Sequence, residues 1–322
     1  MTLRILDAAA TRAALPFERL IPALRALFAQ GCEVPPRHVH EIAAPAGAAG
    51  LTSLLMPAWI CGGYYGVKIV NVAHANAARG LPGLHATYTL FDATTGAPLA
   101  LLDGGEITAR RTVAASALAA QWLARTDARH LLVVGAGRVA ALLPEAYRAV
   151  RTIERVTVWA RAPDKARALA EAWRGAGLAA EAAPELGAAV AAADIVSCAT
   201  LAGEPLIRGA WLQPGSHLDL IGSFTPAMRE ADDDCLRGAA LYVDTVEALA
   251  KSGDLLGPLS RGVFAAADLR GTLASLARGD VPGRRDAAER TVFKSVGTAL
   301  EDLAAAMLAI QGLPQRASEG EG

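Results

Sequence analysis

The sequence lacks the features that would place it in several large classes of protein. Its 322 residues include four cysteines, none of them in a C-x-x-C pair, so neither a disulfide framework nor a structural zinc site is expected. The N-terminal segment lacks the basic-then-apolar order of a signal peptide. No apolar run reaches the length of a membrane span, since Asp194 interrupts the most apolar of them. We therefore expect a cytoplasmic protein with no membrane partner.

An excess of charge of one sign is also missing. The 31 Lys and Arg residues balance 32 Asp and Glu residues, and no basic stripe recurs along the chain, which argues against a nucleic-acid partner. No nucleophile elbow, P-loop or paired-carboxylate constellation is found. His38 and His40 are two residues apart on one strand-like run, but no acidic or cysteine partner stands nearby. We therefore predict no metal site.

The order of secondary-structure signals changes near residue 125, and the chain is long enough for two domains. Before that point, a helical segment at 10–30 precedes several strand-like runs, which predict an antiparallel or mixed sheet. An Ala-rich helix follows at 108–124, with Thr108 as its expected N-cap. After that point, strands alternate with helices of 10–15 residues, which predicts βαβ units and a parallel sheet.

The C-terminal segment from Thr291 is predicted to be one long amphipathic helix that packs back on the first half of the chain. We therefore expect an α/β protein with a discontinuous first domain. Residues 1–124, completed by 291–322, would form an α+β domain, and residues 125–290 would form a separate dinucleotide-binding domain.

The clearest motif is the glycine turn in HLLVVGAGRVAALL, which places G-x-G-x-x-A between an apolar strand and a helix. The first glycine permits a tight turn, the second lets the backbone approach a pyrophosphate, and the small third residue lets helix and strand pack closely. The helix N-terminus would then face the phosphate charge. A tight turn that binds no ligand is the alternative. The predicted cofactor-binding residues are Gly135, Ala136, Gly137, Arg138, Val139, Ala140, Arg161, Thr200 and Gly222.

The end of the second strand of this domain bears on the identity of the dinucleotide. An acidic residue there would accept hydrogen bonds from the ribose 2′-hydroxyl of NAD. The strand instead ends in VTVWAR, with Ala160 at the acidic position and Arg161 beside it. Because an arginine can pair with a 2′-phosphate, NADP(H) is favoured over NAD(H). Arg161 as an ordinary solvated loop residue is the competing interpretation.

Three cations of the first half are candidates for a substrate site. Lys68 lies in the apolar run GYYGVKIVN, Arg37 opens the run RHVHEIA, and Arg111 lies in an Ala-rich helix with few charges. An inward-pointing cation is costly unless an anion meets it, so a small carboxylate would suit such groups. For Lys68, extension of the ammonium to water from a strand edge is the competing explanation.

Together these segments resemble the ornithine cyclodeaminase/mu-crystallin family along nearly the whole chain. The matching motifs, in order, are GVKIVN, HATYTLFDATTGAPLALLDGGEITARRTVAASALA, VVGAGRVA, LIGSFTPAMREAD and TVFKSVGTALEDLAAA. The resemblance implies a Rossmann domain inserted into a substrate and dimerisation domain, and a homodimer. It also implies chemistry at a carbon that bears an amino or imino nitrogen, with the substrate carboxylate held by Arg37, Lys68 and Arg111.

The sequence departs from the family pattern at one informative position. True ornithine cyclodeaminases place an aspartate in the glycine–proline loop, and alignment on Gly222, Pro226 and Glu230 puts Phe224 at that position. Phenylalanine can neither accept a proton nor pair with an ammonium group. Val139 also replaces a glutamine that is common in the nucleotide turn of the family.

These departures favour a reductive reaction over cyclodeamination. The hypothesis is an NAD(P)H-dependent reductase of a small cyclic imino acid, such as pyrroline-2-carboxylate or piperideine-2-carboxylate. Arg37 and Arg111 would hold the carboxylate, Lys68 would hold it or supply a proton, and Phe224 would pack on the substrate ring. The alternatives are an ornithine cyclodeaminase, an alanine-type amino-acid dehydrogenase, and a dinucleotide-dependent binding protein with little turnover.

Overall fold

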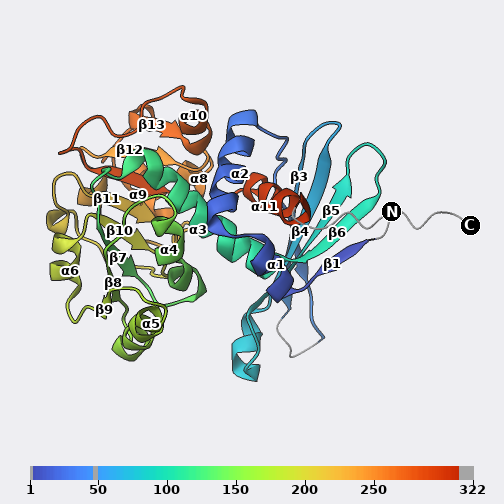
Figure 1. Ribbon diagram of the computed structural model, residues 1–322, viewed down its shortest axis with the longest axis horizontal. Coiled ribbons are helices and arrows are strands. Elements are labelled where there is room, and N and C mark those ends of the chain that lie inside the picture. Colours follow the sequence, from blue (N-terminus) through green and yellow to red (C-terminus); the bar gives the residue numbers. More distant parts are fainter. Residues whose placement is uncertain (1–2, 46–49, 312–322) are drawn as a thin grey trace, which may run out of the picture. The chain divides into compact units, whose positions relative to one another are not determined.

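Two different sheets organise the chain (Figure 1). The computed structural model describes residues 3–45 and 50–311. One unit comprises Met1–Ala23, Cys32–Thr108 and Ala299–Gly322, and a second comprises Leu24–Gly31 and Ala109–Thr298. The predicted α/β fold class is confirmed. Among the described residues, no helix is both long and apolar enough to cross a membrane.

The first unit is built on a six-stranded sheet in the order β1-β6-β5-β4-β3-β2. Neighbouring strands are antiparallel except that β1 runs parallel to β6, so the sheet is mixed, as predicted. The turn between β5 and β6 is tight because the Asp92 carboxylate accepts the backbone N–H groups of Thr94 and Thr95. The strands are β1 (Arg4–Leu6), β2 (His38–Ile42), β3 (Leu51–Trp59), β4 (Tyr64–Val72), β5 (Leu84–Asp92) and β6 (Pro98–Asp103).

The predicted helical segment at 10–30 is two helices, α1 (Ala8–Ala14) and α2 (Phe17–Gln30). The break falls at Leu15, whose backbone leaves the helical region at φ −120° and ψ 52°. The cause is Pro16, because a proline disfavours the helical conformation of the residue before it. A 3₁₀ turn, η1 (His74–Arg79), lies between β4 and β5.

The prediction of a helix from Thr291 is wrong at its start. Residues Thr291–Lys294 form strand β14, and the last helix, α11 (Ala299–Gln311), begins only after it. β14 is a strand because it pairs with β11 on one side and β12 on the other. Helix α11 packs on β3, β4 and β5 of the first sheet (Figure 1). The second unit thus includes residues 291–298, which were predicted to belong to the first domain.

The Ala-rich helix also begins earlier than predicted, as α3 (Gly104–Leu123). The Asp103 carboxylate accepts the backbone N–H of Glu106 at 2.7 Å, which is the hydrogen bond of an N-cap residue. The Thr108 hydroxyl instead donates to the Gly104 carbonyl at 2.8 Å, one turn back inside the helix. Thr108 is therefore not the N-cap, because the capping position is taken by Asp103.

The second unit is built on an eight-stranded parallel sheet in the order β13-β12-β14-β11-β10-β7-β8-β9, which confirms the predicted parallel sheet. Its strands are β7 (His130–Val134), β8 (Arg155–Trp159), β9 (Ala180–Ala182), β10 (Ile195–Cys198), β11 (His217–Leu220), β12 (Ala240–Val243), β13 (Leu269–Thr272) and β14 (Thr291–Lys294). Its helices and 3₁₀ turns are α4 (Arg138–Arg148), α5 (Pro163–Gly175), α6 (Leu186–Ala192), η2 (Gly209–Trp211), α7 (Asp233–Leu236), α8 (Ala248–Lys251), α9 (Gly253–Ser260), η3 (Ala266–Asp268) and α10 (Leu273–Arg278).

Helices cover both faces of this parallel sheet, as its strands require. Leu218 and Leu220 of β11 belong to the apolar core that includes Val190 of α6. Asp219, between them, must point to the opposite face. There its carboxylate accepts hydrogen bonds from Ser116 of α3 at 3.0 Å and Tyr147 of α4 at 2.9 Å. The strand order reverses direction between β7 and β10, and ligands of open α/β sheets bind at the carboxyl ends of strands at such a point.

Candidate functional site

The glycine turn after β7 has the geometry that the motif requires. Gly135 has φ 120°, in a region that residues with a side chain rarely adopt, and its N–H donates to the Trp159 carbonyl at 2.8 Å. A Cβ at this position would lie 2.5 Å from the Ala199 carbonyl oxygen, so no other residue fits. Ala140 is fully buried, which lets α4 pack closely against the strand.

The start of α4 fits a phosphate group. Its N-cap is Gly137, which offers no side chain to satisfy the first N–H groups of the helix. A Cβ at Gly137 would meet no atom within 4 Å, so the space in front of this turn is open. Ala136, Arg138 and Val139 line the same turn. Open space beside uncapped N–H groups at a helix N-terminus is what binding of a pyrophosphate needs.

Thr200 and Gly222 follow β10 and β11, the strands next to the glycine turn in the sheet order. The Glu230 carboxylate ties them together: it accepts the backbone N–H and the hydroxyl of Thr200 at 2.8 and 2.7 Å, and the N–H of Gly222 at 2.7 Å. A Cβ at Gly222 would lie 1.9 Å from the Thr200 carbonyl oxygen. In the sequence, Glu230 served only as a reference point for aligning the loop, and this structural role was not predicted.

Arg161 lies two residues beyond the end of β8, and it is exposed. It stands next to Ala160, the position at which dinucleotide-binding domains contact the ribose 2′ group. Arg167, one turn into α5, is likewise exposed but pairs with Asp164. The structure thus leaves Arg161 accessible at the predicted place.

Lys68 is the clearest surprise of the first unit, because it is 2% exposed and does not reach water. Its ammonium lies 2.7 Å from the Asp302 carboxylate of α11 and donates to the Thr108 hydroxyl at 3.2 Å. The explanation of a strand-edge lysine extended to solvent is therefore wrong. A buried lysine paired with a carboxylate and a hydroxyl is held in one orientation. Asp302 was not predicted from the sequence as the partner of Lys68, although an acidic residue in the apolar segment LEDLAAAM indicated a buried charge.

Tyr88 borders this ion pair. It sits opposite Lys68 on β5, is fully buried, and its hydroxyl makes no hydrogen bond to any residue that the structure describes. Burial raises the pKa of Tyr88 well above its usual value, and the nearby Asp302 carboxylate raises it further. Lys68, Asp302 and the protonated Tyr88 together form a cluster of three polar side chains in an apolar environment.

The remaining predicted substrate residues are distributed over both units. Arg37 is half-buried directly before β2 in the first unit. Arg111, on α3 in the second unit, is only 7% exposed. Its guanidinium packs against Gly297, where a Cβ would lie 2.4 Å from a guanidinium nitrogen. Phe224 is 49% exposed in the loop after β11. Exposure of so large an apolar side chain is compatible with contact to a ligand.

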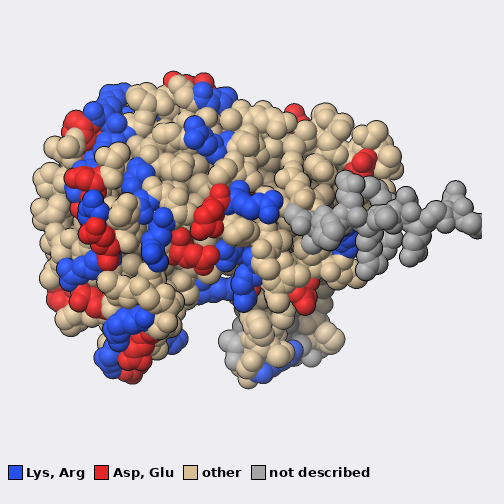
Figure 2. Space-filling model, in the orientation of Figure 1, with Lys and Arg blue, Asp and Glu red and all other residues tan. Residues whose placement is uncertain are grey.

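Acidic and basic side chains are intermixed on the face shown in Figure 2, without a large patch of one sign. His38 and His40 are both exposed. Within the described part of the chain, no three His, Cys, Asp or Glu side chains are grouped to hold a metal ion.

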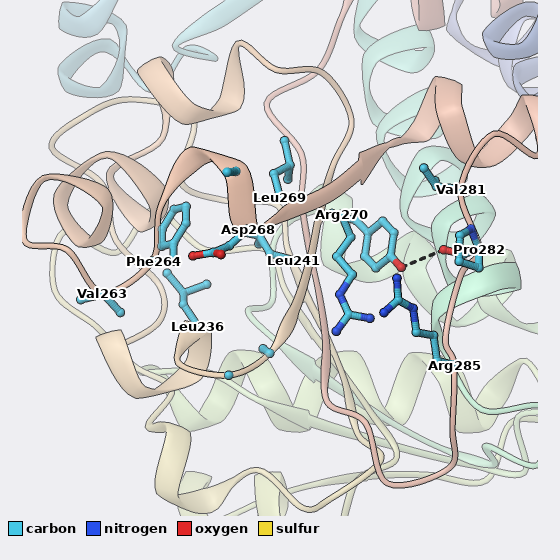
Figure 3. Close-up of a pocket in the computed structure, with 14 residues that line it drawn as sticks. Leu236, Leu241, Val263, Phe264, Asp268, Leu269, Arg270, Val281, Pro282 and Arg285 are labelled. Atoms are coloured by element: carbon cyan, nitrogen blue, oxygen red, sulfur yellow. Dashed lines mark hydrogen bonds between the residues drawn. The ribbon is translucent and has the colours of Figure 1, made fainter.

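A cavity of about 590 Å³ in the second unit lies apart from the predicted residues (Figure 3). It is bounded by residues near the starts of β12 and β13, and Arg270 and Arg285 lie close together on one side of it. The Tyr242 hydroxyl donates to the Pro282 carbonyl at 2.9 Å. Because ligands of parallel α/β sheets bind at the carboxyl ends of the strands, this cavity at the amino ends is not the cofactor site.

Comparisons with known proteins agree with this arrangement. A model of the ornithine cyclodeaminase/mu-crystallin family matches residues 20–313, which confirms the resemblance seen in the motifs. The Delta(1)-pyrroline-2-carboxylate reductase of Paracoccus denitrificans is 44% identical over 278 residues, covering 85% of this chain and 87% of that protein. A solved Delta(1)-pyrroline-2-carboxylate reductase of Thermococcus litoralis, in complex with NADH and L-proline, matches with a TM-score of 0.88 and 32% identity over 96% of each chain. An archaeal alanine dehydrogenase dimer with bound NAD matches with a TM-score of 0.88 and 28% identity, covering 97% of this chain and 96% of that one.

Proposed function

Since the chain belongs to the ornithine cyclodeaminase/mu-crystallin family, we propose that it is an NAD(P)H-dependent reductase of small cyclic imino acids. The observation that carries the proposal is its similarity, over most of its length, to two proteins named Delta(1)-pyrroline-2-carboxylate reductase. Phe224 supports it, because a phenylalanine cannot handle the distal amine that an ornithine substrate would bring. The reaction adds a hydride to the carbon and a proton to the nitrogen of a C=N bond.

The cofactor residues of this proposal are those of the glycine turn and the neighbouring loops. The N–H groups at the start of α4 bind the pyrophosphate, and Thr200 and Gly222 shape the edge of the sheet beyond it. Arg161 binds a 2′-phosphate, so NADP(H) is preferred over NAD(H). When bound, the dinucleotide supplies the hydride. We place the reaction in the cytoplasm.

The substrate residues provide binding and a proton. Arg111 and Arg37 clamp the carboxylate, which holds the carbon of the C=N bond in one position. The Lys68 ammonium, 2.7 Å from the Asp302 carboxylate, donates a hydrogen bond to the substrate and is the proton source for the nitrogen. Phe224 packs against the apolar ring of the substrate and excludes water from that side.

Steady-state kinetics with the purified protein test the proposal. NADPH oxidation is measured with pyrroline-2-carboxylate, piperideine-2-carboxylate, and pyruvate plus ammonia, and ammonia release is measured with ornithine and NAD. We expect turnover of at least one cyclic imine and no ammonia from ornithine. Ornithine converted to proline and ammonia without imine reduction would establish a cyclodeaminase instead. Tight NADPH binding with no turnover of any substrate would favour a binding protein.

We further propose a homodimer, in line with the similarity to an alanine dehydrogenase that forms one. The first sheet supports this proposal on the face opposite Lys68. That face carries Val67 and Ile69, both half-buried, beside an aromatic stack of Tyr65 and Phe91 with ring centroids 5.4 Å apart. Apolar side chains of this kind are covered in an interface between two sheets.

A further inference from the structure

A buried charge cluster lies at the carboxyl ends of β11 and β14 in the second unit. Lys294, the last residue of β14, is fully buried. Its ammonium donates to the Leu220 carbonyl at 2.9 Å and lies 3.7 Å from the Asp254 carboxylate of α9. Burial of an ammonium group costs desolvation free energy, which nearby carboxylates and hydrogen bonds must offset.

The carboxylates around Lys294 hold the backbone of the cofactor edge. Glu230, fully buried, binds Thr200 and Gly222 as described above, with distances of 2.7–2.8 Å. Asp254 in turn accepts the backbone N–H of Glu230 at 2.8 Å and that of Ala231 at 3.1 Å. The loops after β10 and β11 are therefore fixed through Glu230, and Glu230 is fixed through Asp254.

A third carboxylate, Asp244, holds the segment that follows Lys294. It accepts the backbone N–H groups of Val296 and Gly297 at 2.7 and 2.6 Å. Gly297 has φ 77°, and the Arg111 guanidinium packs against it too closely for a Cβ to fit. The position of this predicted substrate-binding arginine thus depends on the same cluster.

The Lys294 ammonium favours the ionised forms of Glu230 and Asp244. Burial raises the pKa of Glu230 to about 7, Lys294 lowers it, and the Asp254 carboxylate raises it. Burial also raises the pKa of Asp244, which Lys294 again lowers. The groups that face Glu230 are Lys294 from β14, Asp254 from α9 and the Cys198 thiol from β10. An ionised Glu230 accepts its three hydrogen bonds best, because protonation turns one carboxyl oxygen into a donor and makes both oxygens weaker acceptors.

We propose that Lys294 is a positioning residue: its buried charge keeps Glu230 and Asp244 in the form that shapes the cofactor edge and seats Arg111. The inference rests on the proposed function, since it concerns the same cofactor and substrate positions. Without the ammonium, Glu230 and Asp244 take up protons more readily and release the loops that they hold.

The test is a fluorescence titration with NADH from pH 6 to pH 9, for the wild-type protein and Lys294→Met. NADH is used because it lacks a 2′-phosphate, which itself titrates near pH 6. We expect wild-type affinity to fall as the pH drops through about 7, where Glu230 becomes protonated. In Lys294→Met the midpoint moves up by roughly one pH unit or more, and binding at pH 7 weakens by roughly fivefold or more.

Two further variants separate charge from packing. Lys294→Met/Asp254→Asn removes a neighbouring negative charge as well, and it should move the midpoint back toward the wild-type value. Val292→Ala, a buried apolar truncation two residues away on β14, should lower thermal stability without moving the midpoint. A Lys294→Met curve that superimposes on the wild-type curve, or a Val292→Ala curve that shifts equally, would refute the proposal.

If Lys294→Met does not fold, the variant Glu230→Gln tests whether Glu230 causes the pH dependence of NADH binding. Its neutral side chain cannot titrate, so NADH binding should be weaker than wild type at pH 8 and independent of pH across the range. A wild-type pH dependence in Glu230→Gln would overturn the inference. These readouts need no imine substrate. Failure of the proposed reaction with every imine would therefore leave this test intact, whereas failure of wild-type protein to bind NADH at all would count against the proposed function.

Discussion

Lys68 shows what a single residue in the sequence can and cannot reveal. A cation in the run GYYGVKIVN was recognisable as unusual, and the family resemblance pointed to its role. Its burial was not predictable, because the partner Asp302 is far away in the sequence and meets it only when α11 packs on β4. Tyr88 was missed for the same reason: cross-strand pairing, which sequence does not state, places it opposite Lys68.

Lys68→Met is predicted to affect both stability and catalysis. It leaves the Asp302 carboxylate in a buried site without its ammonium partner, which should lower the free energy of unfolding by about 3–5 kcal/mol. It also removes the proposed proton source, so kcat/KM for the cyclic imine should fall by about 10² or more. Urea unfolding and NADPH oxidation measure the two effects.

A double variant separates these two effects. Lys68→Met/Asp302→Leu replaces both charges with apolar groups of similar size, and it should recover much of the lost stability while activity stays low. Val70→Ala, on the same face of β4, serves as a control that loses packing without touching the ion pair. A double variant with wild-type kcat/KM would show that Lys68 is needed only for the fold.

At the scale of elements, the two halves of the chain were predictable to different degrees. The βαβ alternation was clear because β7 and β8 are apolar strands that are each followed by a helix with its own start and stop signals. β14 was missed because TVFK is short and only four residues separate it from a helical pattern, and its pairing with β11 and β12 makes it a strand. The start of α3 was misplaced because Thr108 was the predicted N-cap, whereas the Asp103 carboxylate, five residues earlier, caps the helix.

The loop after β8 carries the prediction on cofactor choice. Arg161→Ala removes the proposed charge-assisted bond to a 2′-phosphate, so the KM for NADPH should rise about tenfold or more while the KM for NADH stays unchanged. The control is Arg167→Ala, which removes an exposed arginine of the following helix that already pairs with Asp164. An equal change with both cofactors, or the same change in the control, would contradict the role of Arg161.

At the scale of the whole molecule, the question is whether one chain is the functional unit. On the first sheet, the face with Lys68 packs on α11, whereas the opposite face leaves Val67 and Ile69 half-buried. Trp59 adds to the aromatic stack on that face, with its ring centroid 6.3 Å from that of Tyr65. The sequence could not distinguish the two faces, because Val67, Lys68 and Ile69 together obscure the alternation.

The last prediction follows from that unequal burial. Ile69→Lys places an ammonium in the proposed interface between two copies of the sheet, where its desolvation should weaken dimerisation by about 100-fold or more. Light scattering coupled to size exclusion should then find a dimer for wild type and a monomer for the variant at micromolar concentration. The matched change Leu256→Lys, at a 36% exposed leucine of the second unit, should stay dimeric. A monomeric wild-type protein, or a dimer that survives Ile69→Lys, would mean that this face is not the interface, and the half-buried apolar side chains would then need another partner.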